Sequence, residues 1–160
     1  MNYTEQEELR AKTREFLSTK EWSRPWTITL TMKQFLTNPY RQLTEDAASR
    51  NFTRFKRSVN RHFFGKAYKR RGQSVKVVPV LEFSVVNRRL HYHVLMDCPT
   101  EDISKFKEVI LTSWRETEWG DSHVHMEPAS PENPDGFLSY MTKAKNLNDV
   151  VDWVNVELSP

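Results

Sequence analysis

Two β-rich runs, residues 75–86 and 89–96, dominate the middle of this 160-residue sequence. β-Branched and aromatic residues predominate in both runs, and only the polar pair Asn87-Arg88 separates them. Runs of this composition joined by a short polar turn are typical of a β-hairpin. Pro79 within the first run is awkward in a central strand and indicates an edge position or a bulge. An antiparallel hairpin is therefore expected at the centre of the fold.

The segments before and after this hairpin predict further strands and a long helix. Residues 26–32 alternate β-branched and apolar side chains after Pro25, which predicts a strand, and residues 123–127 predict another. A helix is expected from Thr44, a good N-cap residue, to about Gly65. Its apolar stripe consists of Ala48, Phe52, Phe55, Val59 and Phe63. This stripe predicts that one face of the helix packs against the sheet.

A second amphipathic helix is expected from Thr100 onward, with two carboxylates at its positive end. Its apolar stripe consists of Ile103, Phe106, Ile110 and Trp114. A short helix over residues 136–145 and a last strand over 150–156 follow, while residues 1–20 predict a polar helical arm. The resulting order predicts an α+β domain with a mostly antiparallel sheet.

Length and composition narrow the class of protein. A chain of 160 residues with 38% hydrophobic and 28% charged residues is expected to be one globular domain, residues 1–160. The single cysteine, Cys98, excludes an internal disulfide and a cysteine-based zinc cluster, which leaves histidines and carboxylates as metal ligands. No run approaches eighteen apolar residues and no secretory signal is visible, so we expect a cytoplasmic protein without a membrane partner.

The charge of the chain is distributed unevenly. Residues 50–71 contain nine Lys or Arg and no carboxylate, whereas the rest of the chain carries 15 basic and 21 acidic residues. A cationic segment on an otherwise acidic protein indicates contact with a nucleic-acid backbone, although a solvated helix face gives the same pattern. The candidate DNA-binding residues are Arg50, Arg54, Lys56, Arg57, Arg61, Lys66, Lys69, Arg70 and Arg71.

Three residues of the predicted hairpin form a candidate metal site. His91 and His93 are two residues apart on a strand, so both imidazoles point to the same face while Tyr92 points to the other. If Asn87-Arg88 is a two-residue turn, Glu82 lies opposite His93 on that same face. A carboxylate within so apolar a run needs a partner, which favours a Glu82, His91 and His93 triad over a simply hydrated face.

A second pair of reactive residues is Tyr140 and Lys143. Residues three apart on a helix share a face, so the phenol and the ammonium could act on one substrate group. A tyrosine hydroxyl has a pKa near 10 in water, so it needs neighbouring positive charge to become a nucleophile. An ordinary surface tyrosine and lysine would have the same spacing, and the pair gains weight only beside the metal triad.

The order of these motifs resembles that of the HUH endonucleases, in particular the single-tyrosine rolling-circle replication initiators. The resemblance rests on Glu82, on His91-Tyr92-His93, on Tyr140-Met141-Thr142-Lys143 about fifty residues later and on the strand 26–32. It covers about residues 24–146. It implies a ferredoxin-like or RRM-like antiparallel sheet with flanking helices.

The resemblance also implies roles for individual residues. Glu82, His91 and His93 would bind Mg²⁺ or Mn²⁺, Tyr140 would attack a DNA phosphodiester, and Lys143 would assist it electrostatically. The implied partner is single-stranded DNA or an origin hairpin of a plasmid, phage or virus. Because the sequence has no P-loop motif, a separate helicase is expected.

Alternatives remain open. His123 and His125 form a second His-x-His pair that is an alternative metal pair or a DNA contact. A single-tyrosine transposase is a related possibility, although Glu82 and Lys143 argue against it. A mobilisation relaxase would need Tyr3 as its nucleophile. A non-catalytic RRM-like nucleic-acid-binding module would bind without metal and form no covalent adduct, and a metal-dependent hydrolase would not need Tyr140.

Overall fold

The computed structural model describes residues 3–18, 21–130 and 150–158. Within these ranges the helices are α1 (Tyr3–Ser18), α2 (Glu45–Phe64), α3 (Lys66–Arg71) and α4 (Ile103–Arg115). The strands are β1 (Pro25–Met32), β2 (Phe35–Thr37), β3 (Tyr40–Gln42), β4 (Val77–Ser84), β5 (Arg89–Asp97), β6 (Gly120–Pro128) and β7 (Val150–Val151). The predicted α+β class is confirmed, and the arm, the strands at 26–32 and 123–127 and both long helices are present.

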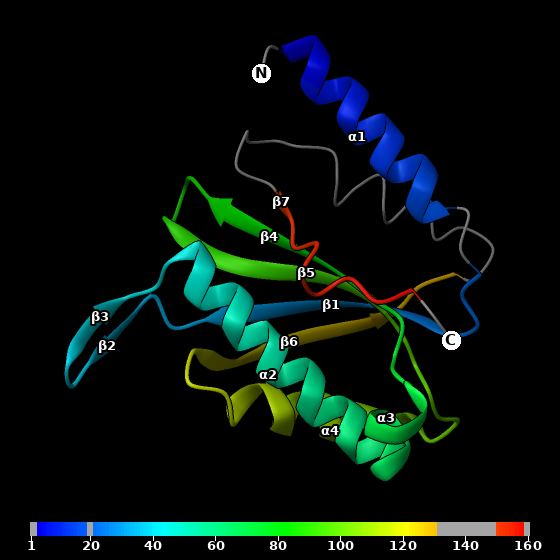
Figure 1. Ribbon diagram of the computed structural model, residues 1–160. Helices are drawn as coiled ribbons and strands as arrows, with labels where there is room; N and C mark the ends of the chain where they lie inside the picture. Colours follow the sequence, from blue (N-terminus) through cyan, green and yellow to red (C-terminus); the bar gives the residue numbers. More distant parts are fainter. Residues whose placement is uncertain (1–2, 19–20, 131–149, 159–160) are drawn as a thin grey trace.

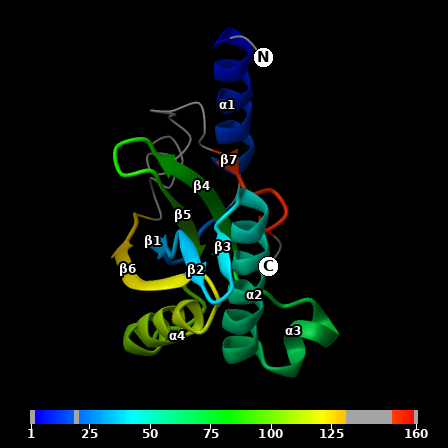
Figure 2. The ribbon, with the colours of Figure 1, turned by 90° about the vertical axis from the view of Figure 1, so that its left-hand side faces the viewer.

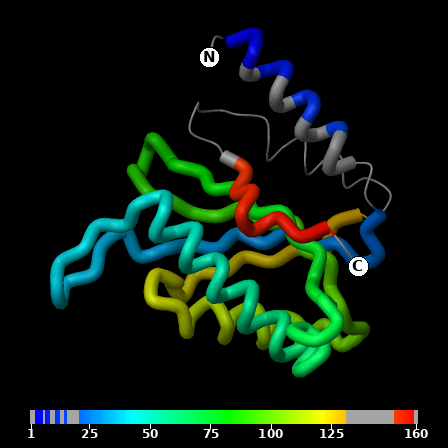
Figure 3. The backbone as a smooth tube through the Cα atoms, viewed as in Figure 1, coloured from blue at the N-terminus to red at the C-terminus, as the bar shows by residue number. Residues whose placement is uncertain are grey.

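A five-stranded antiparallel sheet with the order β6-β1-β5-β4-β7 forms the centre of the molecule. Helices α2 and α4 lie side by side against one face of this sheet, and α1 projects from the other side (Figures 1 and 2). Strands β2 and β3 form a separate hairpin that extends beyond the sheet (Figure 3). The arrangement is an antiparallel sheet flanked by helices, consistent with a ferredoxin-like fold.

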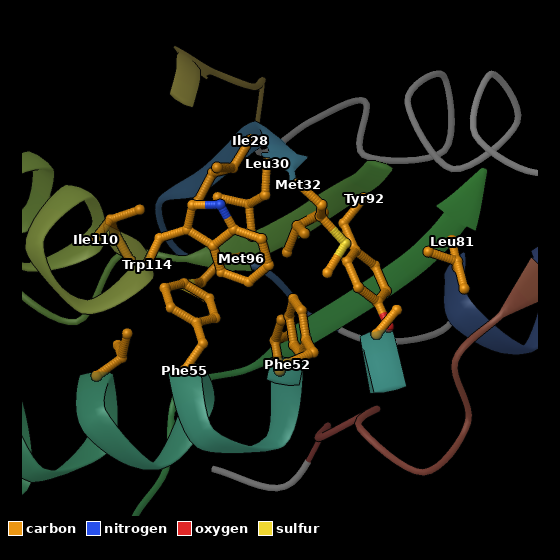
Figure 4. Close-up of a cluster of buried hydrophobic side chains, with 14 of the residues drawn as sticks. Ile28, Leu30, Met32, Phe52, Phe55, Leu81, Tyr92, Met96, Ile110 and Trp114 are labelled. Carbon is orange, nitrogen blue, oxygen red and sulfur yellow. The ribbon is translucent and has the colours of Figure 1, made fainter. Parts of the chain in front are cut away.

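The core lies between the sheet and the two long helices (Figure 4). Alternate side chains of β1 and β5, such as Leu30 and Tyr92, point towards the helices, because side chains of a strand alternate between its faces. Phe55 of α2 packs edge-on against Trp114 of α4, with ring centroids 5.4 Å apart. The apolar stripes predicted for both helices therefore face the sheet, except that Ile103 is 37% exposed.

The helix boundaries show why Ile103 is exposed. Helix α4 begins at Ile103 rather than at Thr100, because the side chain of Asp102 accepts a hydrogen bond from the Lys105 backbone and caps the helix. The start of α2 agrees with the prediction, since Thr44 accepts a hydrogen bond from the Ala47 backbone as its N-cap. An N-cap can therefore be identified from residue type, but a choice between neighbouring candidates depends on local geometry.

The β4–β5 hairpin differs from its predicted register. Four residues, 85–88, separate the strands instead of two, and Glu82 pairs with His91 rather than with His93. The prediction of a two-residue turn is thus wrong. The register shift is two residues, however, and a shift by an even number leaves every side chain on its original face.

Three further segments differ from the sequence-based expectations. The end of the basic segment, expected as a loop, contains helix α3. The last strand is shorter than the predicted 150–156: β7 spans two residues, and Glu157 adds one isolated bridge to Val77. Pro79 causes no bulge in the β4–β5 pairing; its carbonyl accepts a hydrogen bond from Asp152 on the β7 side, where β4 has only this short neighbour among the described residues. The helix predicted over 136–145 lies outside the described residues.

Candidate metal centre

The sheet face opposite α2 and α4 carries the candidate metal site. His91 and His93 of β5 and Glu82 of β4 point to this face, whereas Tyr92 between the histidines points into the core. The predicted separation of the two faces is confirmed. A smaller apolar cluster, consisting of Trp22, Val78, Val80 and Leu95, covers another part of the same face.

The three side chains converge on one point. His91 Nε2 lies 2.9 Å and His93 Nε2 2.5 Å from Glu82 Oε2, and the two Nε2 atoms are 3.1 Å apart. Each side chain is only about one fifth exposed, with values of 17%, 21% and 22% for His91, His93 and Glu82. Among the described residues, these three form the one group of His, Cys, Asp or Glu whose ligand atoms come together in this way.

The protonation of His93 suits a metal ligand. Burial lowers the pKa of His93 from its ordinary value, and the neighbouring His91 lowers it further, while Glu82 opposes both effects. A neutral imidazole has the free nitrogen lone pair that a metal ion requires. The environment therefore keeps a ligand-competent form of His93 at neutral pH.

The distances also fit a divalent cation with octahedral coordination. Mg²⁺ binds its ligands at about 2.1 Å, so neighbouring ligand atoms of an octahedron lie about 3.0 Å apart. Two of the three distances in the triad, 2.9 and 3.1 Å, match this spacing. Glu82, His91 and His93 could thus occupy one triangular face of an octahedron and leave the opposite positions to water or a substrate phosphate.

Thr29 of β1 supports the triad from the neighbouring strand. It pairs with His93 across the β1–β5 ladder, and its hydroxyl lies 3.4 Å from His93 Nδ1. A hydroxyl at this position can accept a hydrogen bond from the protonated Nδ1, which leaves Nε2 directed at the metal position. Sequence analysis missed Thr29, because its proximity to His93 depends on β1 being the neighbour of β5 in the sheet.

The second histidine pair lies on the same face but forms no comparable site within the described part of the chain. His123 and His125 belong to the edge strand β6, and both are exposed. His125 Nε2 lies 2.9 Å from Glu127 Oε1, but no third ligand from the described residues joins this pair. The interpretation of His91 and His93 as the metal pair is therefore favoured over the alternative.

The basic segment lies in the helical layer, on the other side of the sheet from the triad (Figures 1 and 2). Arg50 forms an ion pair with Asp46, and Arg54 approaches Glu118 at 3.9 Å. Lys56 is half-buried, its ammonium donates to the Asn155 carbonyl, and burial lowers its pKa. The remaining residues of the segment, Arg57, Arg61, Lys66, Lys69, Arg70 and Arg71, are exposed. These cations therefore do not line the face that carries the triad.

Tyr140 and Lys143 lie outside the described residues. The chain is described up to Ser130, shortly after β6, and again from Val150 in β7. The C-terminal segment that follows is held by polar contacts. Asp152 accepts hydrogen bonds from Tyr92 and Ser49, and the buried Asn155 accepts one from Thr53 of α2.

Fold and site together define an α+β protein with a Glu–His–His metal-binding geometry on the face of an antiparallel sheet that lies opposite its two long helices. The chain belongs to the replication-associated protein family represented by ORF2, whose model matches residues 25–145. This match covers the strands that build the triad as well as Tyr140 and Lys143. No curated protein and no solved structure is significantly similar to the chain. Within the described ranges, no helix combines the length and apolarity needed to span a membrane.

Proposed function

We propose that the protein is a Mg²⁺- or Mn²⁺-dependent endonuclease that nicks and rejoins single-stranded DNA to initiate rolling-circle replication. The observation that supports this proposal most directly is the convergence of Glu82, His91 and His93 on one sheet face of a replication-associated protein. Two imidazoles and a carboxylate suit a cation that binds phosphate oxygens. The donation of the carboxylate by β4 also supports the initiator type over the transposase type, in which the third ligand belongs to the tyrosine helix.

In the proposed reaction, Tyr140 is the nucleophile. Its phenolic oxygen forms a bond to the scissile phosphorus while the bond from phosphorus to the 3′ oxygen breaks. The products are a 5′-phosphotyrosine and a strand with a free 3′-hydroxyl, which takes up the proton that the tyrosine loses. A divalent cation at the triad would polarise the phosphate and stabilise its developing charge. Lys143, one helical turn from Tyr140 in the predicted helix, would favour the phenolate.

Because one phosphodiester replaces another, the strand can be rejoined by attack of a 3′-hydroxyl on the phosphotyrosine. This reversibility suits an initiator, which must release a circular strand at the end of a round of synthesis. Tyr92 is unsuited to the nucleophilic role, since it is buried, donates a hydrogen bond to Asp152 and has a raised pKa as a result of burial.

The decisive experiment is a search for the covalent intermediate. Pooled single-stranded fragments of the protein's own replicon are incubated with the protein and Mn²⁺ or a chelator, then separated on a denaturing gel. We expect a slowly migrating protein–DNA band that requires both Mn²⁺ and Tyr140, and that is absent for Tyr140→Phe. Tyr3→Phe is the matched control, and it also tests the relaxase alternative, because Tyr3 is the N-terminal candidate nucleophile.

The other outcomes identify the competing functions. Metal-independent binding without a band from any fragment would contradict the proposal and favour the RRM-like binding module. Cleaved DNA without a band, undiminished in Tyr140→Phe, would favour a metal-dependent hydrolase.

A further inference from the structure

The β2–β3 hairpin exposes two aromatic rings. Phe35 is 56% and Tyr40 69% exposed, and they lie at opposite ends of the paired segment formed by Phe35–Thr37 and Tyr40–Gln42. The hairpin stands apart from the five-stranded sheet (Figures 1 and 3). Only Leu36 among its residues packs against the main core. The two rings are thus not needed to fill the interior of the protein.

The two rings are arranged as a stack. Their centroids are 6.2 Å apart and their planes are inclined by 29°. One hydrophobic residue on a surface is ordinary, but two neighbouring aromatic rings that project together into solvent indicate a contact surface. Aromatic rings exposed in this way provide flat faces on which unpaired bases of any sequence can stack.

The charges around the rings favour a polyanion. Residues 33–42 contain Lys33 and Arg41 and no carboxylate. Beside β3 lies a hollow of about 370 Å³ that is lined by Arg41, Arg50 and Arg54 together with Glu118. Three guanidinium groups face one carboxylate there, and guanidinium groups bind phosphate oxygens well.

The base of the hairpin is tied to the strand that carries the metal ligands. Gln34 donates hydrogen bonds to the Met32 and Leu90 carbonyls, and its own carbonyl accepts one from the Leu90 backbone. Leu90 directly precedes His91. The hairpin therefore begins at the end of the sheet where Thr31 pairs with His91, and one DNA strand could contact both the triad and the hairpin.

We propose that the Phe35–Tyr40 stack binds unpaired bases of the DNA substrate, while Arg41 and the neighbouring arginines contact its phosphates. This inference rests on the proposed function, because it takes DNA as the substrate of the triad. It assigns recognition of the single-stranded state to the hairpin, since the bases of a duplex are already stacked on one another and do not offer free faces to the rings.

The test compares single-stranded with duplex binding. Fluorescence anisotropy measures the Kd of a labelled single-stranded 20-mer and of the same sequence as a duplex, with a chelator present so that no cleavage occurs. The variants are Phe35→Ala, Tyr40→Ala and the double variant, with Tyr40→Phe as the control that keeps the ring and Tyr3→Ala as a control at another exposed aromatic residue.

We expect each alanine substitution to weaken single-strand binding by at least about 5-fold, the lower end of the effect of losing one stacked base. Duplex binding should change less than 2-fold, and Tyr40→Phe and Tyr3→Ala should bind as the wild type does. Unchanged single-strand affinity in the double variant would overturn the proposal. Equal losses for single strand and duplex would overturn it as well, because the rings would then not distinguish unpaired bases.

A second measurement maps the contact directly. A single strand containing 5-iodouracil is irradiated with the wild-type protein, and the cross-linked peptides are identified by mass spectrometry. Cross-links to residues 33–42 support the proposal, and cross-links confined to other segments contradict it. A change in oligomeric state of the double variant, measured by light scattering, with unchanged DNA affinity would instead show that the rings bind another protein chain.

These measurements separate the two proposals. If no metal-dependent adduct forms while the alanine variants lose single-strand affinity selectively, nicking is wrong and the hairpin inference stands. If the adduct forms while the variants bind as the wild type does, nicking stands and the hairpin inference is wrong.

Discussion

Replacing Glu82 by Gln tests the metal centre without reference to catalysis. The substitution keeps the shape of the side chain but removes the negative charge that lies 2.9 and 2.5 Å from the two imidazoles. Mg²⁺ and Mn²⁺ favour oxygen ligands, above all carboxylates, so the two remaining histidines should bind these ions far more weakly. The observable is the rise in melting temperature that Mn²⁺ produces.

The size of that rise follows from linkage. At a Mn²⁺ concentration one hundred times its Kd, an ion that binds only the folded protein raises the free energy of unfolding by about 2.7 kcal/mol. For a chain of this length, each kcal/mol corresponds to about 2–4 °C, so the wild type should gain about 5–11 °C. If Glu82→Gln weakens binding 100-fold, the gain at the same Mn²⁺ concentration falls to about 0.4 kcal/mol, or about 1–2 °C.

The chain contains a matched control on the same sheet face. Glu127 lies 2.9 Å from His125, as Glu82 does from His91, but the pair is 65–70% exposed and has no third ligand among the described residues. Glu127→Gln should therefore keep the full Mn²⁺-dependent rise. Each variant is compared by differential scanning calorimetry with its own metal-free sample. A full rise in Glu82→Gln, or its loss in Glu127→Gln, would refute the assignment of the metal site.

Three further predictions follow from individual contacts. Thr29→Val should weaken Mn²⁺ binding by about 10- to 100-fold in isothermal titration calorimetry, because it removes the hydroxyl next to the Nδ1 atom of a metal-binding imidazole; an unchanged Kd would show that this hydroxyl does not orient the ring. Tyr92→Phe should lower the free energy of unfolding by about 1.5–3 kcal/mol in urea titrations, because the buried hydroxyl donates to Asp152. Burial raises the pKa of Tyr92, so the unfolded chain releases this proton first, and part of the wild type's stability should be lost as the pH rises above about 10 but not in Tyr92→Phe, whose pH profile would otherwise match the wild type's. Replacing both Arg57 and Arg61 by Gln should reduce the slope of log Kd against log salt for single-stranded DNA by about 1.4 if both contact phosphates; an unchanged slope would mean that the helical layer does not bind the DNA.

Much of the fold follows from local patterns in the chain. The spacing of Ala48, Phe52, Phe55 and Val59 predicts which face of α2 is buried, and Thr44 predicts where this helix begins. The hairpin turn was predicted incorrectly, because Val85 and Val86 continue the β-rich composition into the loop, where both are exposed. Composition cannot show where strand pairing ends, since the last paired residues and the first loop residues are chemically alike.

The prediction of the metal site succeeded for a reason that does not depend on the turn. Glu82, His91 and His93 share a face in any register that differs by an even number of residues, because side chains alternate along a strand. The convergence of their three ligand atoms agrees with that expectation. The chemical nature of the site was therefore already determined by residue type and parity.

The amino-acid sequence by itself determined the α+β class, the faces of the two long helices and the identity of the triad, because each depends on a periodicity of two or about 3.6 residues within one or two neighbouring segments. Three features required the tertiary structure: Thr29 beside His93, the basic segment on the opposite side of the sheet from the triad, and the exposed aromatic stack near the metal centre. Each of these depends on the order of strands in the sheet or on how a helical layer packs against it. Such relations join residues that are distant along the chain, and no local pattern encodes their distance in space.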